Sequence, residues 1–193
     1  MAPLNFVLVG VGGQGTILAS DILTEVGLRA GYDAKKAEVH GMAQRGGSVI
    51  THIRWGEKVY SPLIGKGEAH FLLALEKLEA LRYVEFLRPG GTALVNDHAI
   101  PPVAVNIGAI SYPDDERIKN TLSQVAGRIL FIPALRKAEE LGDARVTNII
   151  LLGALSSLLD VPEEVWQKVL ERRVPQRYLE LNLKAFQEGR KLI

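Results

Sequence analysis

The stretch NFVLVGVGGQGTILASDIL, residues 5–23, runs from an apolar strand through a glycine turn into an amphipathic helix. Residues 4–9 are almost continuously apolar, which is typical of a strand buried on both faces. A helix is predicted over 16–30, because its apolar residues recur at helical spacing before Gly31. The N-terminus of this helix would carry unpaired N–H groups and the positive end of the helix dipole, so an anion-binding site is predicted there. The turn itself consists of Gly10, Val11, Gly12, Gly13, Gln14 and Gly15.

The spacing of Gly10, Gly12 and Gly15 matches the dinucleotide motif G-x-G-x-x-G, with Asp33 or Glu38 placed to meet a ribose. The residues that follow do not complete such a fold. A second strand is predicted over 32–39, and only the eight residues 40–47 separate it from the alternating run 48–55, whereas a parallel crossover needs about a dozen. Gln14 also places a side-chain amide where a phosphate cradle normally uses backbone N–H groups. A stand-alone NAD(P)-dependent oxidoreductase and a turn without a ligand remain alternatives.

The remaining pattern predicts an α/β fold with a mixed, mainly parallel sheet, flanking helices and an antiparallel hairpin insertion. The hairpin is expected to pair 48–55 with 56–60. Further strands are expected over 70–75, 92–96, 103–107 and 128–132, and helices over 76–87, 114–127 and 134–141. The C-terminal third reads as helical only, over 148–159, 162–172 and 176–191. We expect one domain over 1–193, with a sheet core at 1–145 and the helices of 146–193 packed on it.

A second concentrated stretch, EVHGMAQRGGSVITHIR, covers residues 38–54. Gly46 and Gly47 permit positive φ angles, and Arg45 brings a planar fork of donors beside exposed backbone amides. His40 and Gln44 add a titratable group and an amide. These residues suit the capture of a carboxylate or phosphate, on a small molecule or on a partner. The alternative is the start of a hairpin with a surface arginine.

Composition excludes several functions. Lys and Arg number 23 against 22 Asp and Glu, a formal net charge of +1, which gives no sign of nucleic-acid binding. There is no cysteine, so this chain cannot hold an iron–sulfur cluster by its own thiolates. Four scattered histidines show no metal-ligand spacing, and we expect no metal site. No apolar run reaches the roughly 20 residues of a bilayer span, so no membrane contact and a cytoplasmic location are expected.

Taken together, GVGGQGT, AEVHGMAQRGGSV, SPLIGKGEA, LRPGGTALVND, NIILLGAL and LNLKAFQEG occur in this order. The chain resembles the γ-type subunit or domain of the 2-oxoacid:ferredoxin oxidoreductases, most of all the indolepyruvate type, over nearly its whole length. The resemblance implies oxidative decarboxylation of arylpyruvates with coenzyme A to aryl-acyl-CoA, CO₂ and reduced ferredoxin. Other possibilities are the γ subunit of a pyruvate or 2-ketoisovalerate enzyme, and a non-catalytic binding module of the same fold.

The resemblance also implies a division of labour within a hetero-oligomer. Thiamine diphosphate, Mg²⁺ and [4Fe-4S] clusters are expected in a larger α subunit, ferredoxin acts through the complex, and this chain alone binds no cofactor. Turn 10–15 and loop 40–47 are expected to face the subunit junction, where Arg45 would neutralise an anionic group of coenzyme A or the oxoacid. Asn96, at the end of a strand, is expected at the same carboxyl edge of the sheet. No catalytic residue is assigned.

Overall fold

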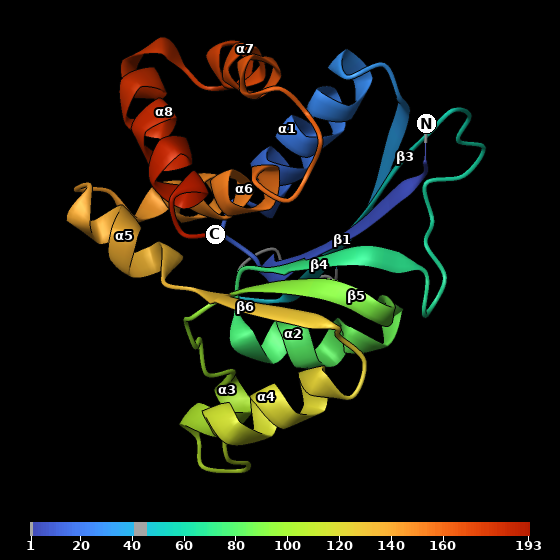
Figure 1. Cartoon of the computed structure of the whole chain (residues 1–193). Coiled ribbons are helices and arrows are strands. Elements are labelled where there is room, and N and C mark those ends of the chain that lie inside the picture. The colour runs from blue at the N-terminus through green and yellow to red at the C-terminus, as the bar shows by residue number, and fades with distance from the viewer. Residues whose placement is uncertain (1, 41–45) are drawn as a thin grey trace.

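The computed structural model describes residues 2–40 and 46–193 and has a six-stranded sheet between two layers of helices (Figure 1). The strand order is β2-β3-β1-β4-β5-β6. The pairs β1/β4, β4/β5 and β5/β6 are parallel, whereas β3 is antiparallel to both β1 and β2. The strands are β1 Leu4–Val11, β2 Asp33–His40, β3 Ser48–Gly56, β4 Ala69–Ala74, β5 Leu87–Asn96 and β6 Arg128–Ile132. The mixed, mainly parallel α/β sheet predicted from the sequence is therefore confirmed.

The antiparallel insertion has a different pairing from the one that the sequence suggested. Residues 57–60 form no strand, and β3 pairs instead with β2 on one side and β1 on the other. Val59 is buried, and its N–H donates to the Asp33 carboxylate at 2.8 Å. The run after Gly56 is therefore tied to the start of β2. β3 also separates β1 from β2, so the first βαβ crossover passes over an inserted strand.

The helices follow the predicted order with one exception. Residues 103–107, expected as a strand, form the short helix α3 and its C-terminal cap Ile107, because the Pro101–Pro102 pair leads into a helical turn and both sides of the preceding strand β5 are already paired, with β4 and β6. The helical elements are α1 Thr16–Arg29, α2 Lys77–Tyr83, η1 Val84–Phe86, α3 Val103–Asn106, α4 Asp115–Ser123, α5 Ala134–Glu140, η2 Ala144–Val146, α6 Thr147–Ser156, α7 Glu163–Arg173 and α8 Gln176–Arg190. None of the helices in the described ranges is long and apolar enough to cross a membrane.

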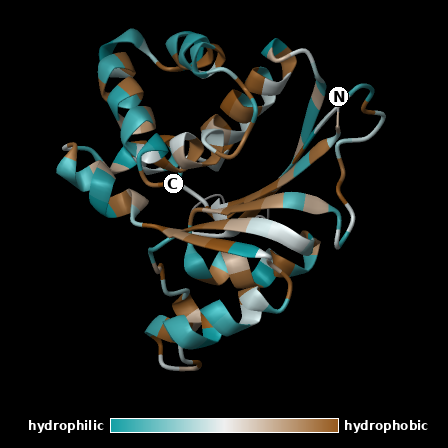
Figure 2. Cartoon of the chain, viewed as in Figure 1, coloured by the Kyte–Doolittle hydropathy of each residue, from teal (hydrophilic) through white to brown (hydrophobic). Residues whose placement is uncertain are grey.

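Each face of the sheet has its own apolar core. On one face, Phe6, Leu8 and Trp55 of the sheet pack with α1 and with the C-terminal helices, and on the other Val7, Val9 and Leu72 pack with α2 and α4. Figure 2 shows hydrophobic residues along the strands and hydrophilic ones on the outer helices. Because α6 to α8 share one continuous core with the sheet, we infer that the described residues form one folding unit, as predicted for the single domain.

Helix α6 lies at the centre of the C-terminal part. All ten of its residues are buried, as expected for an apolar run too short to span a bilayer. Its contact with α8 depends on Gly153 and Gly189, where any side chain would collide with the backbone of the opposite helix. The close approach of these two helices therefore has its cause in two glycines.

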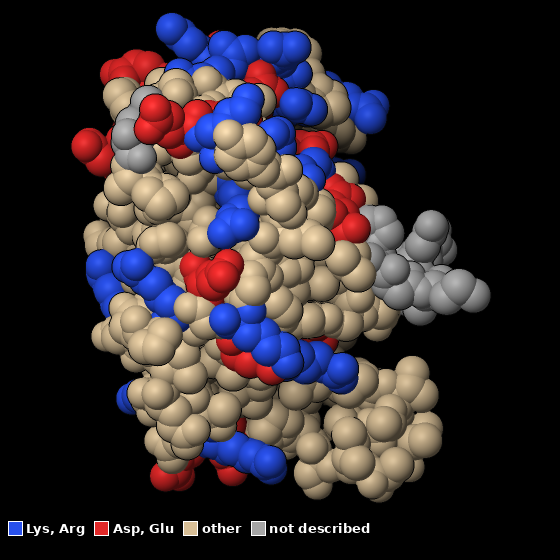
Figure 3. All heavy atoms as spheres, turned by 90° about the vertical axis from the view of Figure 1, so that its right-hand side faces the viewer, with Lys and Arg blue, Asp and Glu red and all other residues tan. Residues whose placement is uncertain are grey.

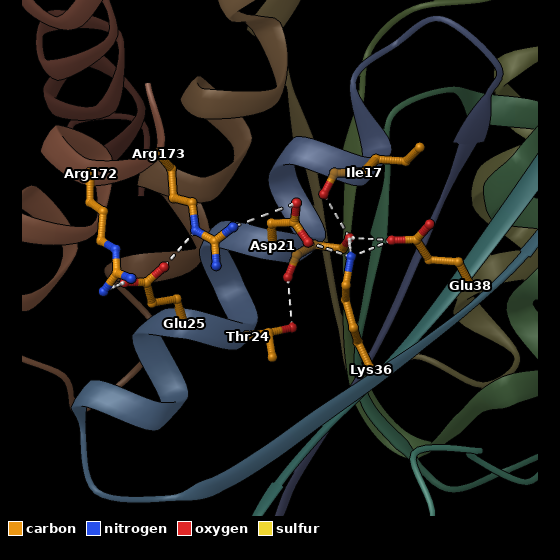
Figure 4. Close-up of polar contacts among 9 residues, drawn as sticks. Ile17, Asp21, Thr24, Glu25, Lys36, Glu38, Arg172 and Arg173 are labelled. Atoms are coloured by element: carbon orange, nitrogen blue, oxygen red, sulfur yellow. Dashed lines mark hydrogen bonds and ion pairs between the residues drawn. The ribbon is translucent and has the colours of Figure 1, made fainter. Parts of the chain in front are cut away.

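A chain of ion pairs joins α7 to α1 and α1 to β2 (Figure 4). The Glu25 carboxylate accepts from Arg173 Nε at 2.5 Å and from Arg29 Nε at 3.1 Å. Arg173 also reaches Asp21 at 4.0 Å, and Asp21 in turn pairs with Lys36 on β2. Burial by itself raises the pKa of Glu25, but the hydrogen bonds and charges of the arginines outweigh it, so that its pKa lies below the ordinary value.

Replacing Glu25→Gln is expected to lower the free energy of unfolding at pH 7 by about 1–3 kcal/mol, because the arginines lose their buried charged partner. A carboxyl whose pKa is depressed by folding stabilises the fold above its unfolded pKa and loses that contribution as the pH falls through its folded pKa. The difference between wild type and variant should therefore shrink from pH 7 towards pH 3, as measured by urea unfolding. A difference that stays constant or grows over this range would contradict the assignment.

Candidate functional site

The glycine turn joins the end of β1 to the start of α1. Gly13 and Gly15 adopt left-handed φ angles of 105° and 77°, which non-glycine residues rarely adopt. At Gly15 there is a second constraint, since a Cβ atom would lie 2.5 Å from the side-chain nitrogen of Asn148. Glycine at position 15 is thus required both by the conformation of the turn and by the close approach of α6.

The described end of the second loop lies directly against this turn. The N–H of Gly12 donates to the carbonyl of Gly47 at 2.8 Å, and the N–H of Gly46 donates to the carbonyl of Gly12 at 3.3 Å. These bonds extend the antiparallel ladder of β1 and β3 by one step. His40 ends β2, but its side chain lies outside what the structure describes, as do residues 41–45, among them Gln44 and Arg45.

Two side-chain amides fix the turn to the neighbouring strands. Gln14 accepts from the N–H of Val11 at 2.7 Å and donates to the carbonyl of Leu75 at 3.0 Å. Asn96, which is fully buried, donates to the same carbonyl at 3.1 Å and accepts from the N–H of Leu135 at 3.3 Å. Both amides are engaged with backbone groups, so these two residues shape the site rather than offer free groups to a ligand.

A cleft of about 490 Å³ opens where the turn, the ends of β4 and β5, and the start of α6 meet. Its position at the carboxyl ends of parallel strands is the usual place for ligands in open α/β sheets. Of the predicted site residues, Gly13, Gln14, Gly15 and Asn96 border it. Its wall is completed by Leu18, Leu75, His98, Ile100, Leu135, Ala144, Arg145, Thr147 and Asn148.

The N-terminus of α1 contributes a positive dipole end to this cleft. No side chain of the described residues caps the helix, and its first turn contains no acidic residue. Unpaired N–H groups at the start of a helix attract anions. Asn148 donates to the carbonyl of Gly15 at 3.0 Å, and its own oxygen is buried without a hydrogen-bond partner among the described residues. The cleft therefore combines the N-terminus of α1, which attracts negative charge, with the buried oxygen of Asn148, an acceptor without a partner among the described residues.

Arg145 stands at the rim of the cleft in a fixed orientation. The carboxylate of Asp143 holds its Nε at 2.9 Å and its Nη2 at 2.6 Å, and the guanidinium lies over the ring of Tyr178 at 5.1 Å. Hydrogen bonds from Arg145 lower the pKa of Asp143 to about 2, and the carboxylate in turn raises the pKa of Arg145. Because this pair is close to neutral, Arg145 supplies a directed donor more than a net positive field.

Sequence reasoning assigned no role to Arg145 or Asn148. Asn148 had a visible signal, because a lone amide at the start of the apolar run NIILLGAL implies a polar contact. Arg145 lies in the connection between the predicted helices 134–141 and 148–159, and nothing in the neighbouring sequence distinguishes it from other surface arginines.

The chain belongs to the pyruvate ferredoxin/flavodoxin oxidoreductase family, whose sequence model matches residues 5–192. It is 40% identical over 192 residues to indolepyruvate oxidoreductase subunit IorB from Thermococcus kodakarensis, covering 98% of this chain and 95% of that protein. The same subunit from Pyrococcus horikoshii is also 40% identical, with the same coverage. The gamma subunit of a keto/oxoacid ferredoxin oxidoreductase from Geobacter sulfurreducens superposes with a TM-score of 0.72 at 26% identity, over 98% of this chain and 97% of that one.

A double-mutant cycle on Gln14→Ala and Asn96→Ala tests the shared carbonyl of Leu75. Each single change is expected to lower the free energy of unfolding by about 1–3 kcal/mol, because a buried backbone group loses its partner. The two losses should be non-additive by about 0.5 kcal/mol or more, since both amides use one acceptor. Chemical unfolding of the four proteins measures this. Strict additivity would show that the amides act independently.

Proposed function

We propose that the chain is the smaller subunit of a ferredoxin-dependent 2-oxoacid oxidoreductase acting on arylpyruvates, with coenzyme A as co-substrate. The supporting observation is the family match over residues 5–192, joined with 40% identity to proteins named as indolepyruvate oxidoreductase subunits. These names favour the indolepyruvate type over the alternative pyruvate or 2-ketoisovalerate type. The products are aryl-acyl-CoA, CO₂ and reduced ferredoxin.

The redox chemistry would belong to a larger subunit of a hetero-oligomer. This chain does not fit an iron–sulfur cluster, because its sequence contains no cysteine. Over residues 2–40 and 46–193, no group of three His, Asp or Glu side chains is placed to hold a metal ion. In this proposal, thiamine diphosphate, Mg²⁺ and [4Fe-4S] clusters would be bound by the partner, and ferredoxin would act through the complex.

This chain would contribute the binding of an anionic part of coenzyme A in the cleft. The N-terminus of α1 attracts phosphate, Arg145 directs a donor at its rim, and the unpartnered oxygen of Asn148 can accept from a ligand group or water. Gly12, Gly46 and Gly47 form one continuous rim beside it. Arg45 would add charge to the same rim, a prediction from the sequence on a residue outside the described ranges.

The stand-alone NAD(P)-dependent alternative has less support. Its two candidate ribose ligands are engaged elsewhere, since Asp33 accepts from Val59 and Glu38 pairs with Lys36. The strand next to β1 on that side is the antiparallel β3, whereas a dinucleotide-binding half has a parallel one. The glycine turn is therefore better explained as a rim at a subunit junction.

Reconstitution tests the proposed function. Arylpyruvate- and coenzyme A-dependent reduction of ferredoxin is expected when this chain is mixed with the larger subunit, and neither chain should be active alone. The measurement is the reduction rate of each chain and of the mixture. NAD(P)-linked oxidation of a substrate by the isolated chain, or full activity of the larger subunit without this one, would contradict the proposal.

In the reconstituted complex, Arg145→Ala is expected to raise the apparent KM for coenzyme A by about three- to tenfold, the effect of one directed charged donor. Arg45→Ala should raise the KM for coenzyme A or the oxoacid, or lower turnover. Arg128→Ala is the matched control, because Arg128 is exposed at the opposite, N-terminal end of β6. Steady-state kinetics that do not distinguish the three variants from wild type would remove both arginines from the site.

A further inference from the structure

Residues 100–113, here called the apolar projection, contain no charged side chain. They run from Ile100 through α3 to Pro113 and extend from the carboxyl end of the sheet, below α2 in Figure 1. In Figure 3, the lobe at the lower right, at the height of α3 in Figure 1, shows no Lys, Arg, Asp or Glu, while charges of both signs mark the rest of that face.

The projection presents large aliphatic side chains to solvent. Val103 is 74% exposed, Ile107 73% and Ile110 57%. Val103 and Ile107 are four residues apart, so they lie on one side of the α3 turn. The equally uncharged stretch 146–159 behaves in the opposite way, since its helix α6 is buried throughout. A cluster of exposed aliphatics on a segment that itself contains no charged side chain is characteristic of a protein–protein contact.

The fold holds the projection in place at both ends. The carboxylate of Glu76, which is 1% exposed, accepts from the N–H of Ile100 at 2.9 Å and from the hydroxyl of Tyr112. The same hydroxyl accepts from the N–H of Leu78 at 3.1 Å. Burial and the Glu76 carboxylate both raise the pKa of Tyr112, so its hydroxyl remains a donor at any ordinary pH. One buried carboxylate thus anchors the first and the penultimate residues of the projection.

Lys77 forms ion pairs with the residues that flank the projection on either side in the sequence. Its ammonium pairs with Asp97 at 3.2 Å before the segment and with Asp115 at 2.6 Å after it. Within the segment, the N–H of Ile107 donates to Val103 at 3.0 Å and that of Ala109 to Ala104 at 2.9 Å. The exposed side chains are therefore carried on an ordered backbone, and their binding to a partner would cost little further ordering.

The start of the projection lies between the cleft and a second, smaller groove. A groove of about 180 Å³ runs between Val103 and Gly46, and Ile100 borders both this groove and the cleft. Glu79 and Arg82, which form an ion pair at 3.2 Å, are its charged lining residues. A surface that covers the cleft from the side of Gly46 would therefore also meet the projection, where the charges of the described groove residues Glu79 and Arg82 cancel.

We infer that the apolar projection docks the larger subunit, with Val103 and Ile107 inserted into an uncharged, apolar recess of that partner. The inference rests on the proposed function, which requires the partner to bring its cofactor to the cleft. A partner held at the projection is placed over the rim of Gly12, Gly46 and Gly47. Docking through a second copy of this chain would cover the same aliphatics but bring no cofactor to the cleft.

The test compares Val103→Asp/Ile107→Asp with Tyr60→Asp/Leu63→Asp, in which two exposed residues near the opposite end of the sheet are changed. Tyr60 is 89% exposed and Leu63 57%. The Kd for the isolated larger subunit, carrying its cluster, is measured by calorimetry. The projection variant should weaken binding by at least about 30-fold, as loss of central interface anchors does, and the control by less than about threefold. Both variants should keep the wild-type circular dichroism and Tm, and Val103→Ala/Ile107→Ala repeats the test with a milder change.

The outcomes separate this inference from the proposed function. If wild type binds the larger subunit and the projection variants bind equally well, the docking inference is wrong and the proposed function stands. If the isolated wild type is a dimer that the projection variant dissociates, while binding to the larger subunit is unaffected, a second copy occupies the projection and the inference is again wrong. If the wild type itself fails to bind the larger subunit, both are wrong.

Discussion

The antiparallel pairing of β1 with β3 is the constraint on which the site depends. Its register sets Val11 opposite Ser48, so the next residues along both chains, Gly12 and Gly47, meet through backbone hydrogen bonds. Two glycine-rich segments about 35 residues apart in the sequence become one rim in this way. A one-residue slip in a sheet moves every side chain to the other face, so burial of a strand specifies its register, and seven of the eight residues of β1 are buried. The apolar core on each side of the sheet therefore also holds the rim.

Polar groups around the rim are divided between structure and binding. The carbonyl of Leu75 receives both Gln14 and Asn96, which ties β1, β4 and β5 together at their carboxyl ends. The N-terminus of α1 and Arg145 border the cleft, and the side-chain oxygen of Asn148, another lining residue, has no hydrogen-bond partner among the described residues. A site with ordered walls and few available groups suits the positioning of a substrate rather than its chemical conversion. This agrees with the proposed function, in which a partner subunit would carry the cofactors, and with a sequence that contains no cysteine.

At the apolar projection, too, one buried polar group holds several segments together. Glu76 caps α2 by accepting from the N–H of Glu79 at 2.9 Å, and the same carboxylate anchors Ile100 and Tyr112. A buried carboxylate is stable only with several donors, and here two of those donors come from the two ends of one exposed segment. Ile100, which borders the cleft, and Tyr112 of the same projection are consequently held by one carboxylate at the start of α2.

Much of the fold was accessible from local sequence. Strands β1 and β6, helix α1 and the three C-terminal helices follow from hydrophobic periodicity and from the glycine and proline residues that bound them. The pairing of β3 was not accessible, because an alternating run indicates a half-buried strand but not its neighbours, and the adjacent residues 56–60 offered a plausible false partner. The strand predicted over 103–107 failed for a related reason, since short β-branched runs are ambiguous until a neighbouring strand is or is not available.

Some features of the candidate site could likewise be predicted from the local sequence, and others could not. Gly10 to Gly15 and Gly46–Gly47 could be named from their residue types, because left-handed glycines and a helix N-terminus leave a local signature. Their meeting, the use of Gln14 and Asn96 as backbone anchors, and the presence of Arg145 and Asn148 required the folded chain, because each depends on contacts between segments far apart in sequence. Local chemistry indicates which groups can bind an anion, whereas long-range packing determines which of them remain available to do so.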